Sequence, residues 1–356
     1  MSDTLVNFPA ANGLSAGQPF SDPMASTPRN QLLALLGMQS LLVHSVTAAA
    51  RLKLADMIGE QTLSLTSLAQ QSQCQPESLR RLLRALASCG IFFETEAGYR
   101  NTPLSAMLVT DRPDSLHGWA CFMGSEQVNR CFEQLDVALA EDGPVFDKLY
   151  GQSFFDYLGQ QPEARGVFAS AMTSYSASGI EDALAAFDFN QAGKLFDIGS
   201  GLGKFLSGIL DANPQLEGTI FDLPEVIAEV EKQADRLNPR LAWQGGNFFS
   251  HIPAGADTYI LRHVLHDWSD EQALLILRQC RKAMHADGQL LIFEHLLTGR
   301  NQPDYAKFLD LVMLTFLTGR ERSEAEYQCL LEQADLRIDR LIKTPGFHTL
   351  LVVKPR

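Results

Sequence analysis

The sequence predicts an α/β protein whose C-terminal half forms a doubly wound sheet and whose N-terminal half is helical. From residue 190 onward, short apolar runs alternate with amphipathic helical segments, the pattern of parallel strands joined by helices. Before residue 190, apolar residues recur mainly at helical spacing. The chain has 356 residues, of which 46% are apolar, so it is long enough for about two domains with their own cores.

Charge and cysteine content narrow the classes of function. The net charge of −13 argues against non-specific binding to nucleic acid or to anionic membranes, because both require a basic surface. None of the six cysteines forms a C-x-x-C pair, which is typical of a protein in a reducing cytoplasm. The uncharged stretch between Arg29 and Arg51 contains several polar residues and is not expected to span a membrane.

The N-terminal region is predicted to be an arm followed by helices. Residues 1–28 contain four prolines and are expected to form a flexible arm. Residues 30–59 read as one helix, apolar around so much of its surface that a second subunit is expected to cover part of it. Residues 66–105 have the pattern of a winged helix, with a hairpin formed by Ile91–Thr95 and Tyr99–Thr102. Four arginines and three glutamates leave this segment a net charge of only +1, too little for binding dominated by phosphate contacts.

A helical connector is predicted over residues 111–185, between an N-terminal domain at 29–110 and an α/β domain at 186–356. Seven apolar runs in the α/β domain are candidate strands. They are Lys194–Ile198, Gly218–Asp222, Leu241–Gln244, Asp257–Leu261, Gln289–Glu294, Arg337–Ile342 and His348–Val353. A short loop with Pro345 and Gly346 separates the last two, which are therefore expected to pair antiparallel.

The strongest local motif is the segment 195–206, in which a strand runs into a glycine-rich turn and then a helix. The glycines allow the backbone to turn tightly and approach a ligand, and the helix N-terminus supplies free N–H groups. The spacing is not that of a phosphate-binding Walker loop, because Ile198 and Phe205 stand where its first glycine and its hydroxyl should be. It is also G-x-G-x-G rather than the G-x-G-x-x-G of dinucleotide sites. If the glycines are considered alone, the alternative to a ligand-binding loop is an ordinary tight turn between a strand and a helix.

Two carboxylates near this turn narrow the choice of ligand. Asp197 lies just before the turn, where it would repel a pyrophosphate but suits an ammonium group. Asp222 ends the next predicted strand, where a carboxylate accepts hydrogen bonds from the hydroxyls of a ribose. S-adenosylmethionine has all three matching groups: an ammonium group for Asp197, a carboxylate for the helix N-terminus and a ribose for Asp222.

From about residue 30 to 356, the sequence resembles the class I S-adenosylmethionine-dependent O-methyltransferases of the plant caffeate and acetylserotonin type, which include bacterial antibiotic-tailoring members. The motifs fall in the family's order: DIGSGLG, FDLP, GNFF at 246–249, LRHVLHDWSDEQ at 261–272, DGQLLIFEH at 287–295 and GRERSEAEY at 319–327. The resemblance implies a Rossmann-like, doubly wound, seven-stranded methyltransferase sheet and an all-helical or winged-helix dimerisation domain. It also implies a cytoplasmic homodimer in secondary metabolism, with S-adenosyl-L-methionine as cofactor and S-adenosyl-L-homocysteine as product.

His266 is the candidate general base. It follows a predicted strand at the sheet edge where ligand crevices form, and Ser269 with Gln272 predicts a capping box at the start of the next helix. An imidazole with a pKa of about 6.5 can take a proton from a phenolic hydroxyl as the methyl group is attacked. The resemblance assigns Glu294 and Glu321 as the two acids that flank this histidine.

A metal-binding interpretation of His266, Asp267 and Asp270 is possible from residue type alone. Asp270, however, would lie in a first helical turn, where the helix dipole already favours an acid, and Asp267 is expected to be structural. No metal is therefore expected. Three further histidines lack a comparable context and are expected to be structural: His263, His285 and His295.

The resemblance also implies the residues that hold the two substrates of the reaction. Those expected at the cofactor are Asp197, Gly199, Gly201, Asp222, Leu223, Asn247, Phe248 and Arg262. The family usually has Asp at position 247 and commonly Gly at position 200, so altered cofactor affinity is expected. The methyl acceptor is expected against Phe168, Met172 and Met313, with plain core packing as the alternative. Weaker candidates are Phe122, Met123, Phe154 and Phe155.

The sequence thus predicts methylation of a hydroxyl group on an aromatic small molecule. Three alternatives stay open: methylation at nitrogen or carbon, a non-methylating reaction that uses the same cofactor as a structural cation, and a regulator whose winged helix binds DNA. The sequence contains no H-E-x-x-H, and its one G-x-S-x-G, at residues 13–17, lies in the proline-rich arm rather than between a predicted strand and helix, so it gives no support for a hydrolase or a zinc protease.

Overall fold

The structure is a computed structural model that describes residues 27–141 and 143–356. The chain divides into two compact units, residues 1–129 and 130–356, and the boundary falls inside one short helix, α7 (Glu126–Phe132). Apart from Thr27 and Pro28, the arm predicted over residues 1–28 lies outside the described residues. Each unit has an apolar core of its own.

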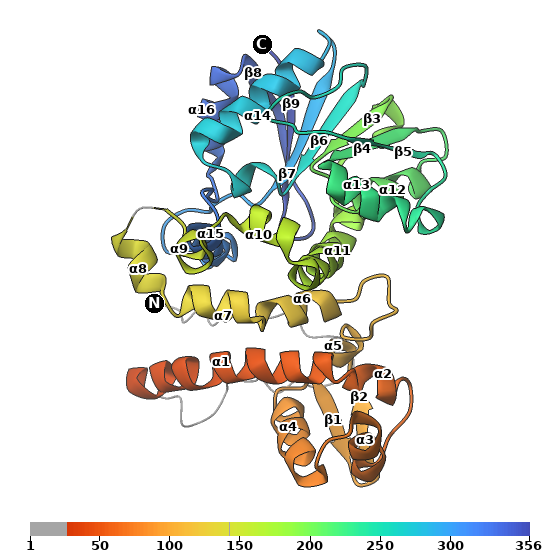
Figure 1. Ribbon diagram of the computed structural model, residues 1–356, viewed down its shortest axis with the longest axis vertical. Coiled ribbons are helices and arrows are strands. Elements are labelled where there is room, and N and C mark those ends of the chain that lie inside the picture. Colours follow the sequence, from red (N-terminus) through yellow and green to blue (C-terminus); the bar gives the residue numbers. More distant parts are fainter. Residues whose placement is uncertain (1–26, 142) are drawn as a thin grey trace. The chain divides into compact units, whose positions relative to one another are not determined.

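Figure 1 labels the elements in chain order. Up to the boundary they are α1 (Pro28–Arg51), α2 (Leu54–Ile58), α3 (Leu65–Ser72), α4 (Pro76–Ser88), β1 (Phe92–Thr95), β2 (Gly98–Asn101), α5 (Pro103–Ala106), α6 (His117–Met123) and α7. Beyond it they are α8 (Leu135–Ala140), α9 (Val145–Tyr150), α10 (Phe154–Gln160), α11 (Pro162–Ala186), β3 (Leu195–Ile198), α12 (Lys204–Ala212), β4 (Gly218–Asp222), α13 (Pro224–Glu231), β5 (Leu241–Gly245), β6 (Thr258–Arg262), α14 (Asp270–Ala283), β7 (Gln289–Glu294), α15 (Ala306–Phe316), α16 (Glu324–Gln333), β8 (Leu336–Lys343) and β9 (Thr349–Pro355).

The first unit is a helical domain with one hairpin. Strands β1 and β2 pair antiparallel, which confirms the predicted hairpin of a winged helix. Helices α1 to α4 pack with this hairpin around a core that includes Leu54, Leu83 and Phe92. The prediction of a single helix over 30–59 is wrong at one point, because Lys53 adopts a left-handed φ of 53° and separates α1 from α2.

Helix α1 exposes many large apolar side chains. Leu36 and Leu41 are the most exposed, at 70% and 68%. The full set is Leu32, Leu33, Leu35, Leu36, Met38, Leu41 and Val43. Among the described helices, α1 is the one that by length and composition could cross a membrane, with a mean hydropathy of 1.6 over an 18-residue window. An apolar surface of this kind also marks an interface with another chain.

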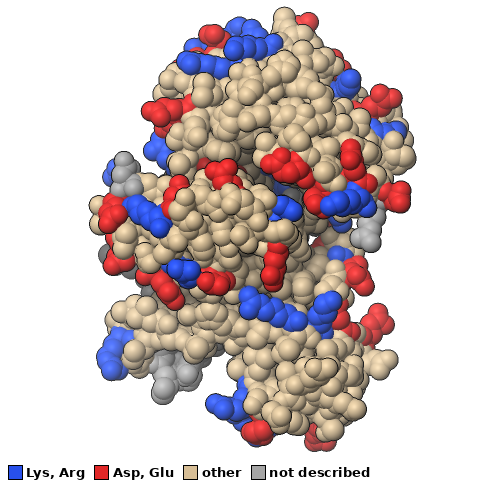
Figure 2. Space-filling model, viewed as in Figure 1, with Lys and Arg blue, Asp and Glu red and all other residues tan. Residues whose placement is uncertain are grey.

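The charges of the winged helix are dispersed. Arg80 on α4 pairs with Glu77 at 2.7 Å, and the guanidinium of Arg100 lies over the ring of Phe93, 4.4 Å from its centroid. On the face shown in Figure 2, Lys and Arg side chains are interspersed with Asp and Glu side chains. This distribution differs from the basic stripe that a DNA-binding helix presents to phosphates.

The second unit is built on a seven-stranded sheet in the order β5-β4-β3-β6-β7-β9-β8. The first five strands of this order are parallel, and β9 is antiparallel to both β7 and β8. This arrangement confirms the doubly wound sheet and the antiparallel pairing of its last two strands. The strand order reverses between β3 and β6, and in such sheets ligands bind at the carboxyl ends of the strands beside this switch point.

Helices cover both faces of the sheet. Along β9, Leu350 and Val352 belong to an apolar cluster that also contains residues of α11, α12 and α13, whereas Leu351 and Val353 belong to the cluster on the opposite face, with residues of α14 and α16. Burial on both faces explains why the strands are continuous apolar runs in the sequence. The same packing on both faces holds the polar residues at the carboxyl edge of the sheet in fixed positions.

Candidate active site

The glycine-rich turn joins β3 to α12. Gly199 has a φ of 67°, and a Cβ added there would lie 2.8 Å from a methyl group of Val264. Gly201 has a φ of 57°, and a Cβ added there would meet no atom within 4 Å. The N–H of Gly201 donates to Oδ2 of Asp222 at 2.7 Å, and the N–H of Leu223 donates to Oδ1 at 2.7 Å. The turn therefore leaves open space beside an anchored carboxylate.

Two predicted cofactor acids are poorly solvated at this edge. Burial raises the pKa of Asp197 to about 7, with Arg262 opposing and Asp222 reinforcing the effect. Burial also raises the pKa of Asp222 to about 6, against the hydrogen bonds from Leu223 and Gly201. A ligand that brings positive charge or hydroxyl donors would stabilise both carboxylates in their charged form.

Arg262 ends β6 on the same side of the sheet as Asp197. Its guanidinium lies over the ring of Phe205, 4.6 Å from the centroid, and against Gly179 of α11, where an added Cβ would overlap it. Burial lowers the pKa of Arg262 to about 10 despite nearby acids that raise it. The guanidinium thus places a positive charge under the carboxyl edge of the sheet.

The GNFF motif follows β5. Phe248 is half-buried, and its ring lies beside Gly199 and 5.9 Å from the centroid of Trp268. Asn247 is exposed, and its Oδ1 accepts from the N–H of Phe249 at 2.8 Å. The structure therefore brings Phe248 to the glycine turn and places the side-chain oxygen of Asn247 in a local hydrogen bond.

His266 lies between two acids from distant parts of the sequence. It sits in a short 3-10 helix, η4 (Leu265–Asp267), directly after β6, and is 6% exposed. Its Nδ1 is 2.7 Å from Oε1 of Glu321 and 3.8 Å from Oε2 of Glu294. Oε1 of Glu294 accepts from the main-chain N–H groups of Val264 and Leu265 at 3.2 and 3.0 Å. The three residues predicted to be catalytic are therefore brought together.

The surrounding carboxylates make His266 a stronger base. Burial lowers its pKa, but Glu294, Glu321 and Asp267 outweigh burial and raise the pKa to about 10. That value resembles the pKa of a phenol, about 10 for a tyrosine side chain. Oδ1 of Asp267 lies 3.4 Å from Nε2 of His266, so the residue expected to be structural also faces the ring.

Arg322 and Gly319 hold this segment, and both escaped the sequence analysis although they lie in the GRERSEAEY motif. Arg322 is fully buried and donates to the carbonyl oxygens of Leu265 and Trp268, each at 2.7 Å. A Cβ on Gly319 would overlap the main-chain carbonyl oxygen of His266. No sequence pattern distinguishes a buried arginine that binds carbonyl groups from a solvated one. After the segment, the predicted capping box at the start of α14 is confirmed.

The residues predicted for the methyl acceptor lie on two helices. Phe168 and Met172 are half-buried and four residues apart on α11, and Met313 is buried on α15. The ring of Phe154 packs edge-on against Phe168 at 5.1 Å and against Phe316 of α15 at 5.4 Å. The ring contacts of Phe154 thus connect the two helices.

Trp268 extends this aromatic surface toward His266. Its ring stacks on Phe155 at 5.6 Å, and Phe155 contacts Phe168 in turn. Trp268 was missed, although its place two residues after His266 was a usable signal. Phe122 and Met123, two of the weaker candidates, lie on α6 of the first unit.

The fold and the site define a class I S-adenosylmethionine-dependent methyltransferase. A seven-stranded sheet with an antiparallel last pair carries a glycine turn, an acid at the end of the next strand and a buried histidine at one edge. The O-methyltransferase domain model matches residues 132–337, and the O-methyltransferase dimerisation domain model matches residues 38–111. The chain belongs to this O-methyltransferase family.

Individual relatives are similar over almost the whole chain. A phenazine O-methyltransferase of Lysobacter antibioticus is 34% identical over 93% of this chain and 97% of its own. An O-demethylpuromycin-O-methyltransferase of Streptomyces alboniger is 36% identical over 86% of this chain and 83% of its own. The crystal structure of human N-acetylserotonin methyltransferase in complex with S-adenosylmethionine superposes with a TM-score of 0.86 at 26% identity, covering 93% and 99% of the two chains.

Proposed function

We propose that the protein is a cytoplasmic homodimer that transfers the methyl group of S-adenosylmethionine to a hydroxyl group of an aromatic small molecule. The observation that carries this proposal is the buried imidazole of His266, held by Glu321 and Glu294 at the sheet edge that also bears the glycine turn. The phenazine and puromycin O-methyltransferases among the relatives support an aromatic acceptor.

The residues at the glycine turn fit the cofactor. Within the described residues, the buried hydroxyl oxygen of Ser200 has no hydrogen-bond partner, and the space beside Gly201 is open. Asp222 would hold the ribose hydroxyls, Asp197 would face the ammonium group, and the N-terminus of α12 would receive the carboxylate. When bound, the cofactor supplies a methyl group on a cationic sulfonium, which is already activated for transfer.

His266 takes the proton of the acceptor hydroxyl in this mechanism. With Nδ1–H donating to Glu321, the lone pair lies on Nε2, which accepts the proton as the oxygen becomes a nucleophile. Glu321 and Glu294 then stabilise the imidazolium. The imidazole must be neutral before this step, and a positive charge bound at the same sheet edge lowers its pKa and favours that form.

The aromatic surface orients the acceptor. Trp268, two residues after the base, stacks on Phe155, which contacts Phe168, and flat apolar rings of this kind hold another aromatic ring in a defined plane while excluding water. Fixing the plane aligns the hydroxyl oxygen with the methyl group, which supplies much of the catalysis in a reaction without covalent intermediates.

A panel of acceptors tests the proposed function. Purified protein is incubated with S-adenosylmethionine and hydroxylated phenazines, other phenols and matched aromatic amines, and the products are identified by mass spectrometry. The expected result is a methyl ether and one S-adenosylhomocysteine per product. Methylation of the amines alone would show that the acceptor atom is nitrogen. Conversion of an acceptor without release of S-adenosylhomocysteine would contradict methyl transfer.

Cofactor affinity is expected to fall with decreasing pH. The pKa values of Asp197 and Asp222 are raised to about 7 and about 6, and the ligand requires both carboxylates charged. Affinity is therefore full above these values, declines through about 7 and declines more steeply below about 6, by up to about tenfold per pH unit and per acid. Calorimetric titration with S-adenosylhomocysteine across this range measures the effect.

Asp222→Asn is the matched variant for this experiment. This variant should bind S-adenosylhomocysteine weakly at every pH, and its affinity should show only the shallow decline with falling pH that Asp197 contributes. An unchanged affinity and pH profile in Asp222→Asn would contradict the ribose-binding role. Circular dichroism at each pH verifies that the protein stays folded.

Dimer formation is expected to depend on the exposed face of α1. The double variant Leu36→Glu and Leu41→Glu places two charges in the proposed interface, which should raise the dimer dissociation constant by at least roughly 100-fold. Sedimentation analysis should find the wild type at twice the chain mass and the variant as a monomer. Leu139→Glu, at a leucine 70% exposed on α8, is the control and should leave the dimer intact. A dimeric double variant would contradict this interface.

A further inference from the structure

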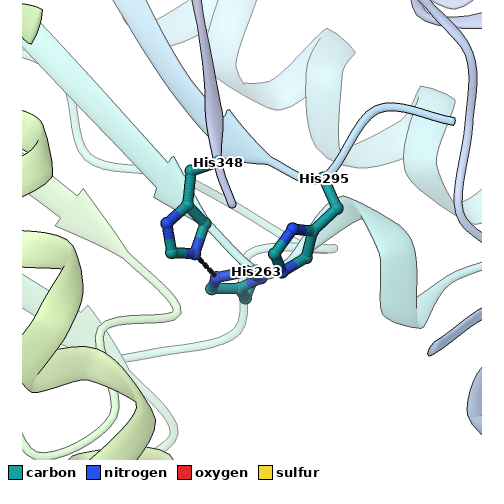
Figure 3. Close-up of side chains that lie close together, drawn as sticks. All are labelled: His263, His295 and His348. Carbon is teal, nitrogen blue, oxygen red and sulfur yellow. Dashed lines mark hydrogen bonds between the residues drawn. The ribbon is translucent and has the colours of Figure 1, made fainter. Parts of the chain in front are cut away.

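Three histidines meet at the carboxyl edge of the sheet (Figure 3). His263 follows β6, His295 follows β7, and His348 precedes β9, so three strands that adjoin in the sheet contribute one residue each. One ligand atom of each imidazole lies within 4.8 Å of those of the other two. The rings are largely buried, and the most exposed of the side chains, that of His263, is 12% accessible. His348 was missed by the sequence analysis, and His263 and His295 were expected to be structural.

The inner nitrogens of the cluster interact with one another and with one tyrosine. Nε2 of His263 lies 2.7 Å from Nε2 of His348, and this distance requires one nitrogen to donate a proton and the other to accept it. Nε2 of His295 lies 2.6 Å from the hydroxyl of Tyr175. Burial lowers the pKa of all three histidines, so the rings are neutral, which is the form that ligates metal ions.

The outer nitrogens face acceptor oxygens. Nδ1 of His295 is 2.9 Å from the carbonyl oxygen of Phe347, and Nδ1 of His348 is 3.5 Å from Oδ2 of Asp182. Nδ1 of His263 is 3.9 Å from Oε2 of Glu294. Metal-binding histidines characteristically direct their second N–H toward a carbonyl or carboxylate oxygen, which leaves Nε2 as the ligating atom. His295 has this arrangement and His348 approaches it, whereas Nδ1 of His263 has no hydrogen-bond partner among the described residues.

His285, also expected to be structural, has a different environment. Its half-exposed side chain lies 3.3 Å from Asp257 and takes no part in the cluster. It therefore serves as a matched control for the cluster.

We propose that His263, His295 and His348 bind a zinc-class divalent cation through their Nε2 atoms. Three neutral imidazoles match the three-histidine coordination of zinc, with a water molecule as the fourth ligand. Asp182 and Glu294 supply negative charge outside the ligands and offset the guanidinium of Arg262. Binding ties together the ends of β6, β7 and β9 and takes no part in methyl transfer.

A rival trio shares one of these histidines. His263, His266 and Glu294 also bring ligand atoms within 4.8 Å of one another. In that trio the His266 nitrogen that faces Glu294 is Nδ1, which is already bound to Glu321, so only Oε2 of Glu294 and Nδ1 of His263 are without a hydrogen-bond partner among the described residues. The three-histidine trio needs only to open one hydrogen bond between rings and to displace one tyrosine hydroxyl.

Zinc titration of the full-length protein, purified without a histidine tag and stripped of metal, tests the proposal. The wild type should bind one Zn²⁺ per chain and gain thermal stability by linkage. His348→Gln and His295→Gln should each weaken zinc binding by at least about 100-fold, because even outer-sphere changes weaken such sites by about 10–100-fold. His285→Gln and His266→Gln should bind zinc as the wild type does, and Tyr175→Phe should bind at least as tightly.

X-ray absorption at the zinc edge of the loaded wild type gives a readout that needs no variant. Three imidazole ligands are expected. A spectrum that shows two imidazoles with a carboxylate would assign the metal to the rival trio and overturn the proposal. Loss of zinc binding in His266→Gln but not in His348→Gln would have the same meaning. Absence of zinc binding by the wild type would overturn it as well.

Discussion

Replacing His266 with Asn is expected to lower kcat by about 10²–10⁴-fold, the usual contribution of a positioned general base. Asparagine preserves a polar side chain of similar reach but cannot accept the hydroxyl proton and carry it as a cation. Cofactor binding should change little, because the glycine turn and Asp222 belong to other strands. Steady-state kinetics with the best acceptor of the panel, together with calorimetric titration of S-adenosylhomocysteine, measures both effects.

The acidity of the acceptor distinguishes a base from a merely structural histidine. A more acidic phenol needs less help in losing its proton, so the difference in kcat between His266→Asn and wild type should shrink with such acceptors. A structural defect would reduce the rates of all acceptors alike. His285→Asn changes an exposed histidine and should retain full activity. If His266→Asn turns over every acceptor at the wild-type rate, the assignment of the base is wrong.

Gly319→Ala is expected to lower kcat/KM by about 10²-fold or more and to lower the melting temperature. The added methyl group would overlap the main-chain carbonyl of His266 and the adjoining peptide, and backbone atoms cannot yield as a flexible side chain can. The segment is also tied to Arg322 through the carbonyls of Leu265 and Trp268. Relief of the overlap must therefore move the imidazole, and a displacement of about 1 Å is enough for a loss of this size.

Gly299→Ala is the control for this substitution. A Cβ at Gly299 would meet only the side chain of Gln302, at 3.6 Å, so activity and stability should be unchanged. Affinity for S-adenosylhomocysteine should fall much less than kcat/KM in Gly319→Ala, because the glycine turn is not part of the contact. Wild-type kinetics in Gly319→Ala would show that the 319–323 segment does not position the base.

Much of the fold could be predicted from local patterns. The seven strands, the hairpin at Phe92–Asn101 and the capping box at Ser269 each depend on residues close together in the sequence. The break at Lys53 could not, because a left-handed residue inside an otherwise helical pattern is imposed by the packing of the elements on either side. Periodicity also cannot tell whether an apolar face is covered by the same chain or by another, as at α1.

In the candidate site, too, some residues could be identified from local sequence patterns and others could not. The motif around His266 and the acids of the glycine turn were accessible from the sequence, whereas Glu294 and Glu321 became candidates only through resemblance, because no local spacing relates residues 28 and 55 positions away to one imidazole. Arg322 and Trp268 lie in or beside recognised motifs, yet their roles depend on contacts with distant backbone and rings.

By itself, the sequence determined the order of strands and helices, the glycine turn and the kind of ligand that its acids suit, since these depend on periodicity and on neighbouring residues. Only the tertiary structure decided which side chains share the carboxyl edge: His266 with Glu321, Gly319 beneath a carbonyl group, and His263 with His295 and His348. The physical reason is that pairing of parallel strands gathers the ends of segments far apart in the chain into one place, and burial there sets their protonation.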